Sequence, residues 1–99
     1  MYLHLGQNVV VSEADVIGIF DLDNTTGSPI TKKFLNDAEK AGLVVNVSDE
    51  LPRSFIVSSN NKGITVFISQ LSPQTLHKRT GDNKVIYDLR LEGDQGSLN

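Results

Sequence analysis

Short apolar runs alternate with turn residues along this chain, a pattern typical of short β-strands. Six such runs predict strands over residues 2–5, 7–12, 16–20, 43–47, 54–58 and 63–69. The last two flank Ser59-Asn60-Asn61-Lys62, so they are expected to pair as a β-hairpin. Apolar and charged residues alternate again over residues 85–91, which predicts one more strand.

One helix is clearly indicated between residues 28 and 42. Ser28 is a good N-cap, and Pro29 suits the first helical position because its missing N–H has no partner there. A single apolar stripe follows at helical spacing, formed by Ile30, Phe34, Ala38 and Ala41. Gly42 is suited to the left-handed conformation that ends a helix. Ser72-Pro73 repeats the cap and predicts a short second helix that stops before Gly81.

Together these elements predict an α+β fold, a small and mostly antiparallel sheet with one main helix and one short C-terminal helix. Phe55-Ile56-Val57 and Val66-Phe67-Ile68 place apolar side chains on both faces of their strands. One long helix and one short helix cannot cover both faces of five or six strands. We therefore expect a second copy of the chain to cover the remainder, as in a homo-oligomer.

The composition narrows the functional classes. With 99 residues the chain fits one domain, and the absence of cysteine excludes disulfides, thiol nucleophiles and thiolate metal sites. Only two histidines are present, and His4, between Leu3 and Leu5, is predicted to share a strand face with Tyr2. The apolar runs are too short to span a bilayer and the first residues lack a signal-peptide pattern. We expect a cytoplasmic protein without a metal or cofactor.

Charge is distributed unevenly along the chain. The net charge is −3, but residues 1–50 carry eight acids and three lysines, whereas residues 51–99 carry four acids and six basic residues. Residues 51–80 contain four basic residues and no acid. Proteins that bind nucleic acid through bulk charge are usually basic overall. Any phosphate contact is therefore expected from local basic groups rather than from the whole domain.

Residues 16–25 resemble the first motif of haloacid-dehalogenase-like phosphatases, an apolar strand ending in Asp-x-Asp-x-Thr. In such an enzyme Asp21 would attack a phosphoryl group and Asp23 would act as acid and base beside magnesium. That fold is a parallel sheet whose crossovers each need a helix. The chain after Asp23 offers only one full helix and one short one. We therefore interpret Asp21, Asp23 and Asn24 as a turn before Ser28 and expect no enzymatic activity.

Six segments are collinear with a known family, in order and at its spacing. They are Tyr2-Leu3-His4-Leu5-Gly6, Val16-Ile17-Gly18-Ile19-Phe20-Asp21, Ser28-Pro29-Ile30, Asn46-Val47-Ser48, Leu51-Pro52-Arg53-Ser54-Phe55 and Ile68-Ser69-x-Leu71-Ser72-x-x-Thr75-Leu76-x-Lys78-Arg79. With these segments the chain resembles the RemB branch of the bacterial extracellular-matrix regulator RemA/RemB family. The resemblance assigns residues 1–80 to a regulatory domain. Outside it, the alternation predicts an additional strand or extension over residues 81–91, and the polar residues 92–99 are expected to form a flexible tail.

The resemblance implies a domain similar to the DNA-binding fold of LytTR-type regulators, assembled into closed rings. It implies a role in transcription of matrix and biofilm genes, with DNA as a partner and room for a RemA-type partner. In the RemA branch, arginines before the second long strand and before the later hairpin look to carry DNA binding. The matching stretches here, residues 12–15 and 48–53, are acidic and retain only Arg53. Adjacent carboxylates weaken the expectation of direct DNA binding.

The predicted DNA contacts are the basic groups on structured segments of this match: Arg53, Lys32, Lys33, Lys78 and Arg79. Each also has a structural interpretation. An ion pair with Asp49 or Glu50 would explain Arg53, and Lys78 and Arg79 suit the negative end of a helix. Three functional interpretations stay open: a ring-forming regulator that contacts DNA weakly or with a partner, an oligomeric scaffold without direct DNA contact, and a small phosphatase, which the number of helices disfavours.

Overall fold

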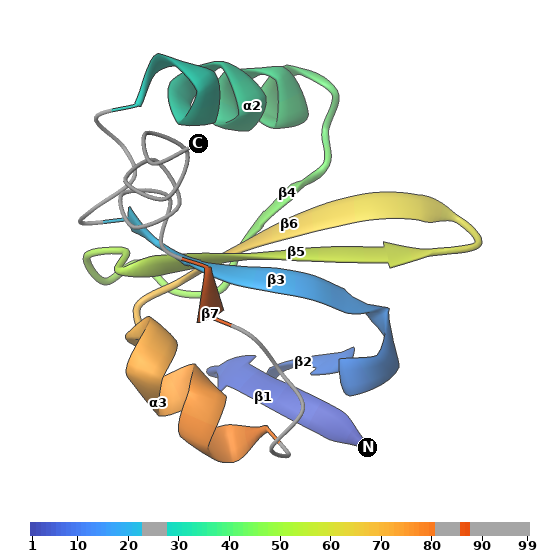
Figure 1. Cartoon of the computed structure of the whole chain (residues 1–99), viewed down its shortest axis with the longest axis vertical. Coiled ribbons are helices and arrows are strands. Elements are labelled where there is room, and N and C mark those ends of the chain that lie inside the picture. Colours follow the sequence, from blue (N-terminus) through green and yellow to red (C-terminus); the bar gives the residue numbers. More distant parts are fainter. Residues whose placement is uncertain (23–27, 81–85, 88–99) are drawn as a thin grey trace, which may run out of the picture.

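The computed structural model of the chain describes residues 1–22, 28–80 and the backbone of 86–87 (Figure 1). Within them the strands are β1 (Tyr2–Gly6), β2 (Val9–Ser12), β3 (Val16–Asp21), β4 (Val44–Asn46), β5 (Ser54–Asn60), β6 (Gly63–Ser69) and β7 (Ile86–Tyr87). The helices are α2 (Pro29–Lys40), α3 (Pro73–Arg79) and the 3₁₀ turn η1 (Glu13–Asp15). These elements confirm the predicted α+β fold with one main helix and one short C-terminal helix.

The strands form two sheets rather than the single sheet expected from the sequence. Five of them lie in the order β4-β6-β5-β3-β7, while β1 and β2 pair only with each other. β3 and β6 both pair antiparallel with β5, whereas β4 and β7 add parallel strands at the two edges. The predicted β5–β6 hairpin is confirmed, with Asn60 paired to Gly63. Asp23, Asn24, the turn at 81–83 and the tail at 92–99 lie outside the described residues.

The caps of α2 follow the sequence prediction. The Oγ of Ser28 accepts the N–H of Thr31 at 3.5 Å, and Pro29 occupies the first turn. At the other end Gly42 has a φ of 74°, and the N–H of Leu43 donates to the carbonyl of Ala38 at 2.9 Å. The N–H of Gly42 donates to the carbonyl of Glu39. These two hydrogen bonds form the left-handed C-terminal cap that glycine favours.

Each face of the five-stranded sheet is covered within the chain (Figure 1). β1, β2 and α3 cover one face, which we call the α3 face, and α2 covers the other, the α2 face. The α3-face core contains Leu3, Leu5, Val11, Ile19, Val47, Ile56 and Leu76. The α2-face core contains Leu22, Ala38, Phe55, Val57 and Val66. Phe55 and Ile56, neighbours in β5, therefore point into different cores.

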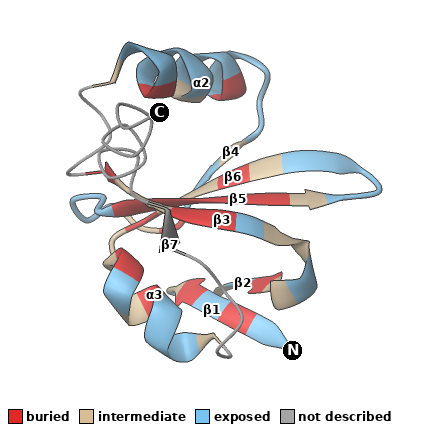
Figure 2. Ribbon diagram, viewed as in Figure 1, coloured by how far each residue is buried: buried red, intermediate tan, exposed pale blue. Residues whose placement is uncertain are grey.

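The prediction that two helices leave part of the sheet uncovered was wrong. β1 and β2 do not join the five-stranded sheet but pack on one of its faces. A second copy of the chain is therefore not needed to cover a face of the sheet. The buried face of α2 is also rotated about the helix axis relative to the predicted apolar stripe. Ile30 is 81 % exposed and Phe34 lies at the rim, whereas Thr31 and Ala38 are buried (Figure 2). Neither helix in the described residues is long and apolar enough to cross a membrane.

Candidate functional site

Arg53 lies at the end of the loop between β4 and β5, with an exposed side chain. Its backbone continues the sheet on both sides, because its N–H donates to the carbonyl of Ser69 at 2.8 Å and its carbonyl accepts the N–H of Leu22 at 3.0 Å. The Cα of Arg53 is therefore held by two neighbouring strands. A rigid base of this kind lets the guanidinium reach a partner with little loss of backbone entropy.

Lys32 and Lys33 lie in the first turns of α2, both exposed. The Nζ of Lys33 forms a salt bridge with Asp37 one turn later, at 2.9 Å, and both side chains are largely exposed. An exposed pair at this spacing contributes only about 0.3–0.5 kcal/mol to stability. The bond to Asp37 would therefore compete only weakly with a phosphate.

Lys78 and Arg79 lie in the last turn of α3, also exposed. Arg79 differs from the other predicted contacts because its Nη1 donates to the backbone carbonyl of His4 at 3.3 Å. This bond ties the end of α3 to β1, which is 75 residues away in sequence. One of the five N–H donors of the guanidinium serves this contact, so the group keeps donors for a second partner.

The structure does not bring the five predicted contacts together on one surface. Lys32 and Lys33 lie on the α2 side of the sheet, whereas Lys78 and Arg79 lie on the α3 side (Figure 1). Arg53 lies between these layers, at the start of β5. A flat DNA surface could therefore meet only a subset of these groups from a single copy of the chain. Their roles in DNA contact stay a prediction.

The two acidic stretches, residues 12–15 and 48–53, lie at opposite ends of one strand pair. In the antiparallel β3–β5 ladder, Val16 pairs with Ser58 and Asp21 pairs with Ser54. Residues 13–15 precede β3 and residues 48–53 precede β5, so five residue steps, roughly 17 Å, separate the two ends. Glu13 and Asp15 therefore do not act on Arg53 at contact distance, whereas Asp49 and Glu50 share its loop.

Only the first aspartate of the phosphatase-like motif lies within the described residues. Asp21 is the last residue of β3, which pairs antiparallel with β5, and Asp23 lies outside the described residues. In the described parts of the chain, no three histidine or acidic residues are placed to hold a metal ion.

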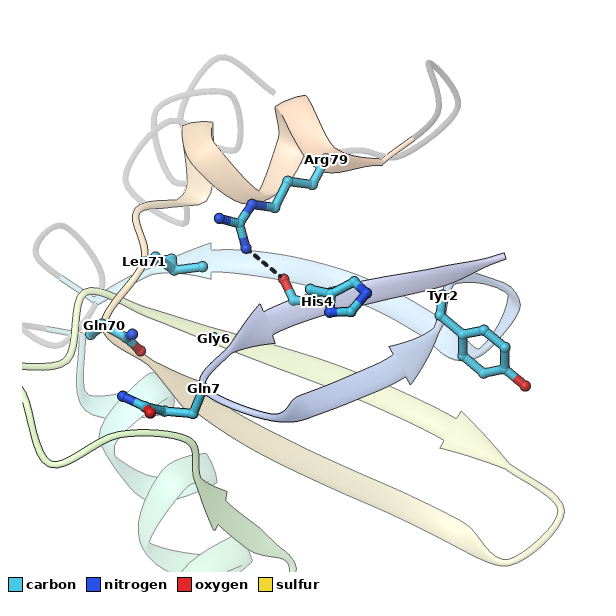
Figure 3. A pocket seen from close by; sticks show the side chains of 7 residues that line it. All are labelled: Tyr2, His4, Gly6, Gln7, Gln70, Leu71 and Arg79. Atoms are coloured by element: carbon cyan, nitrogen blue, oxygen red, sulfur yellow. Dashed lines mark hydrogen bonds between the residues drawn. The ribbon is translucent and has the colours of Figure 1, made fainter.

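A polar cleft lies between β1, the end of β6 and α3, with a volume of about 670 Å³ (Figure 3). Its lining residues are Tyr2, His4, Gly6, Gln7, Gln70, Leu71 and Arg79. Tyr2 and His4 project from the exposed face of β1, as the alternation predicted, while Leu3 and Leu5 are buried below. Gln7 and Gln70 lie together at the β1–β2 turn, and Arg79 reaches over His4 (Figure 3).

The sequence analysis did not find this cleft. Its walls come from residues about 65–75 positions apart, and no local motif joins them. Gly6 at the end of β1 is the one local signal, because a glycine in a strand often marks the close approach of another segment. Here a Cβ on Gly6 would meet the Oε1 of Gln70 at 2.9 Å.

Comparison with known proteins agrees with the family to which the collinear segments point. A family model described as RemA-like, extracellular matrix regulatory protein A-like, matches residues 2–80. The extracellular matrix regulatory protein B of Bacillus subtilis strain 168 is 40 % identical over 79 residues, which cover 80 % of this chain and 89 % of that protein. The family model covers the described helices and all the described strands except β7. The chain therefore belongs to the RemA-like family of extracellular matrix regulatory proteins.

Proposed function

We propose that this protein regulates extracellular-matrix gene expression as a ring-forming homo-oligomer that contacts DNA through Arg53. Membership in the RemA-like family carries the regulatory part of this proposal. The backbone of Arg53, bonded to Ser69 and Leu22, supports its choice as the principal contact. Lys32, Lys33, Lys78 and Arg79 would assist from other surfaces.

A single copy of the chain would bind DNA poorly. Its candidate cations lie on different layers, and Asp49 and Glu50 accompany Arg53 in the same loop. An assembly repeats Arg53 once in each subunit, so weak contacts add when the DNA reaches several subunits together. In this proposal the ring supplies the affinity that one subunit lacks.

An apolar groove on the α2 face supports self-association. It has a volume of about 290 Å³, and its lining residues are Ile17, Phe20, Ile30, Thr31, Phe34, Phe55 and Val57. No charged side chain is among these described residues, so they do not suit DNA. Ile17 and Ile30 are 55 % and 81 % exposed, and exposed apolar residues at a groove are typical of interaction surfaces. We assign the groove to a second copy of this chain, because most soluble assemblies are homo-oligomers.

The direct test is a salt series of DNA binding. Each phosphate neutralised by the protein steepens the slope of log affinity against log salt by about 0.9. Arg53→Ala should weaken binding to all sequences and flatten this slope. Lys62→Ala is the matched control, because Lys62 is also exposed but lies in the turn at the other end of β5. Unchanged binding in Arg53→Ala, or an equal loss in both variants, would reject Arg53 as the contact.

A scaffold without direct DNA contact is the second candidate. The acidic residues at both ends of the β3–β5 ladder favour it, because carboxylates repel phosphate. In this alternative the assembly would act through another protein, such as a RemA-type partner. Absence of DNA binding at low salt, in a sample shown to be oligomeric, would favour the scaffold.

A further inference from the structure

The polar cleft of the α3 face has the size and the chemistry of a small-ligand site. Its volume of about 670 Å³ lies within the usual range for such sites. Arginine, histidine and two glutamines line it, and no acidic side chain is among the lining residues within the described parts of the chain. The cleft therefore suits a ligand that carries negative charge and several hydrogen-bonding groups.

The groups in the cleft are arranged along β1 (Figure 3). Arg79 lies over the middle, above His4, with its guanidinium oriented by the bond to the His4 carbonyl. Gln7 and Gln70 lie at the end formed by the β1–β2 turn, and Tyr2 lies toward the other end. An anionic group would thus bind in the middle, beside groups that donate and accept hydrogen bonds.

Gln70 supplies an independent indication that a partner is missing. Its Oε1 is buried and accepts no hydrogen bond from any residue that the structure describes. Buried carboxamides normally have their oxygen satisfied. A donor on a ligand at the Gln7–Gln70 end would satisfy it after a small rotation of the side chain.

The walls of the cleft are held in place before any ligand binds. The Oγ of Ser69 donates to the carbonyl of Leu5 at 2.7 Å and accepts the N–H of Leu71 at 3.0 Å. Ser69 is fully buried, so β1 is fixed against the segment that carries Gln70 and Leu71. Gly6, with a φ of 119°, leaves the space that the Gln70 carboxamide occupies. A preformed site of this kind loses little entropy on binding.

We propose that this cleft binds a nucleoside phosphate, with the phosphate at Arg79 and His4 and the base at Gln7 and Gln70. Arginine matches the geometry of phosphate oxygens. A nucleobase edge presents both donors and acceptors, which the two carboxamides can meet. Tyr2 adds an aromatic ring at the open end. This site is separate from the apolar groove and from Arg53.

The test is a titration of the protein with AMP, GMP and inorganic phosphate. Calorimetry measures the affinities, and the amide NMR shifts locate the site. Nucleotides should shift the amides of Gly6, Gln7 and Gln70 and should bind more tightly than phosphate alone. Arg79→Gln should lower nucleotide affinity about tenfold, because a charge-assisted contact is lost, and Arg79→Lys should lower it less. Gln70→Leu should weaken nucleotides but leave phosphate binding unchanged.

Lys78→Gln is the matched control, because Lys78 neighbours Arg79 on α3 but does not line the cleft. It should leave nucleotide affinity unchanged, although it belongs to the predicted DNA contacts. Equal losses in both variants, or no binding of either nucleotide, would overturn the proposal. If inorganic phosphate bound as tightly as the nucleotides, the proposed contact of Gln7 and Gln70 with the base would be rejected. Tighter binding of a short single-stranded oligonucleotide, with the same loss in Arg79→Gln, would assign the cleft to nucleic acid instead.

Discussion

The two faces of the sheet are covered to different degrees. On the α3 face, Leu3, Leu5 and Leu76 are fully buried, and side-chain bonds from Ser69 and Arg79 fasten β1 to the rest of the chain. On the α2 face, Phe20 and Phe55 stack with ring centroids 4.7 Å apart, but the helix above them leaves an apolar groove. One layer is closed around its own core, and the other leaves apolar side chains exposed at its groove.

Because of this difference, we expect residues on the α3 face to determine folding stability and residues on the α2 face to determine association between copies of the chain. A residue in the closed layer should contribute to folding, and a residue at the rim of the groove should contribute to association. Substitutions on the two faces therefore test whether stability and association depend on different residues.

The largest effect is expected from Leu5→Ala, in the core of the α3 face. The change removes a fully buried side chain and leaves a cavity, which costs about 2–5 kcal/mol of unfolding free energy. Urea denaturation at fixed protein concentration measures this loss. Val10→Ala is the control on the same hairpin, because Val10 is 43 % exposed and should change stability by less than about 0.5 kcal/mol. Similar losses in both variants would mean that the layer is not closed.

An intermediate effect is expected from Gly6→Ala, at the rim of the same layer. Gly6 and Gly63 have φ values of 119° and 121°, so alanine strains the backbone at both positions by about 1–3 kcal/mol. Only at Gly6 does the new Cβ also meet Gln70, and displacing that side chain should add about 1 kcal/mol. Thermal or urea unfolding of the two variants compares them directly. An equal loss would show that Gln70 moves aside freely.

The smallest effect on stability is expected from Ile30→Ser, at the rim of the groove. Ile30 is 81 % exposed, so the unfolding free energy should change by less than about 0.5 kcal/mol. Its effect should appear in light scattering, as a lower mass at the same protein concentration. Leu51→Ser is the control, because Leu51 is 82 % exposed but does not line the groove. A wild-type protein that is monomeric at micromolar concentration would contradict the role given to this face.

Local signals in the sequence predicted the elements well. Ser28-Pro29 and Ser72-Pro73 begin α2 and α3, and both serines accept the N–H of a residue three positions later. The hairpin at residues 60–63 is confirmed for the same reason, since its geometry depends on adjacent residues. Family membership was also evident from the collinear segments, because they extend over most of the chain.

Long-range contacts were not predictable in the same way. Alternation in residues 2–12 indicates strands, but it does not say whether they join the sheet or lie across it. The rotation of α2 has a similar origin, because Thr31 faces the sheet although a more apolar residue, Ile30, precedes it. The cleft depends on contacts of Gly6 with Gln70 and of His4 with Arg79. Such pairs leave no periodic signal in a single sequence.

The bond from Ser69 to Leu5 also has a consequence for synthesis of the chain. β1 leaves the ribosome early, but its anchor is 64 residues further along. At the usual rate of about 5–20 residues per second, Leu3 and Leu5 wait roughly 3–13 s for β6 and α3 to arrive. During that interval the hairpin is an apolar ribbon without its cover. The nascent chain is therefore most exposed to chaperones, and to misassembly with neighbouring chains, at its N-terminal end.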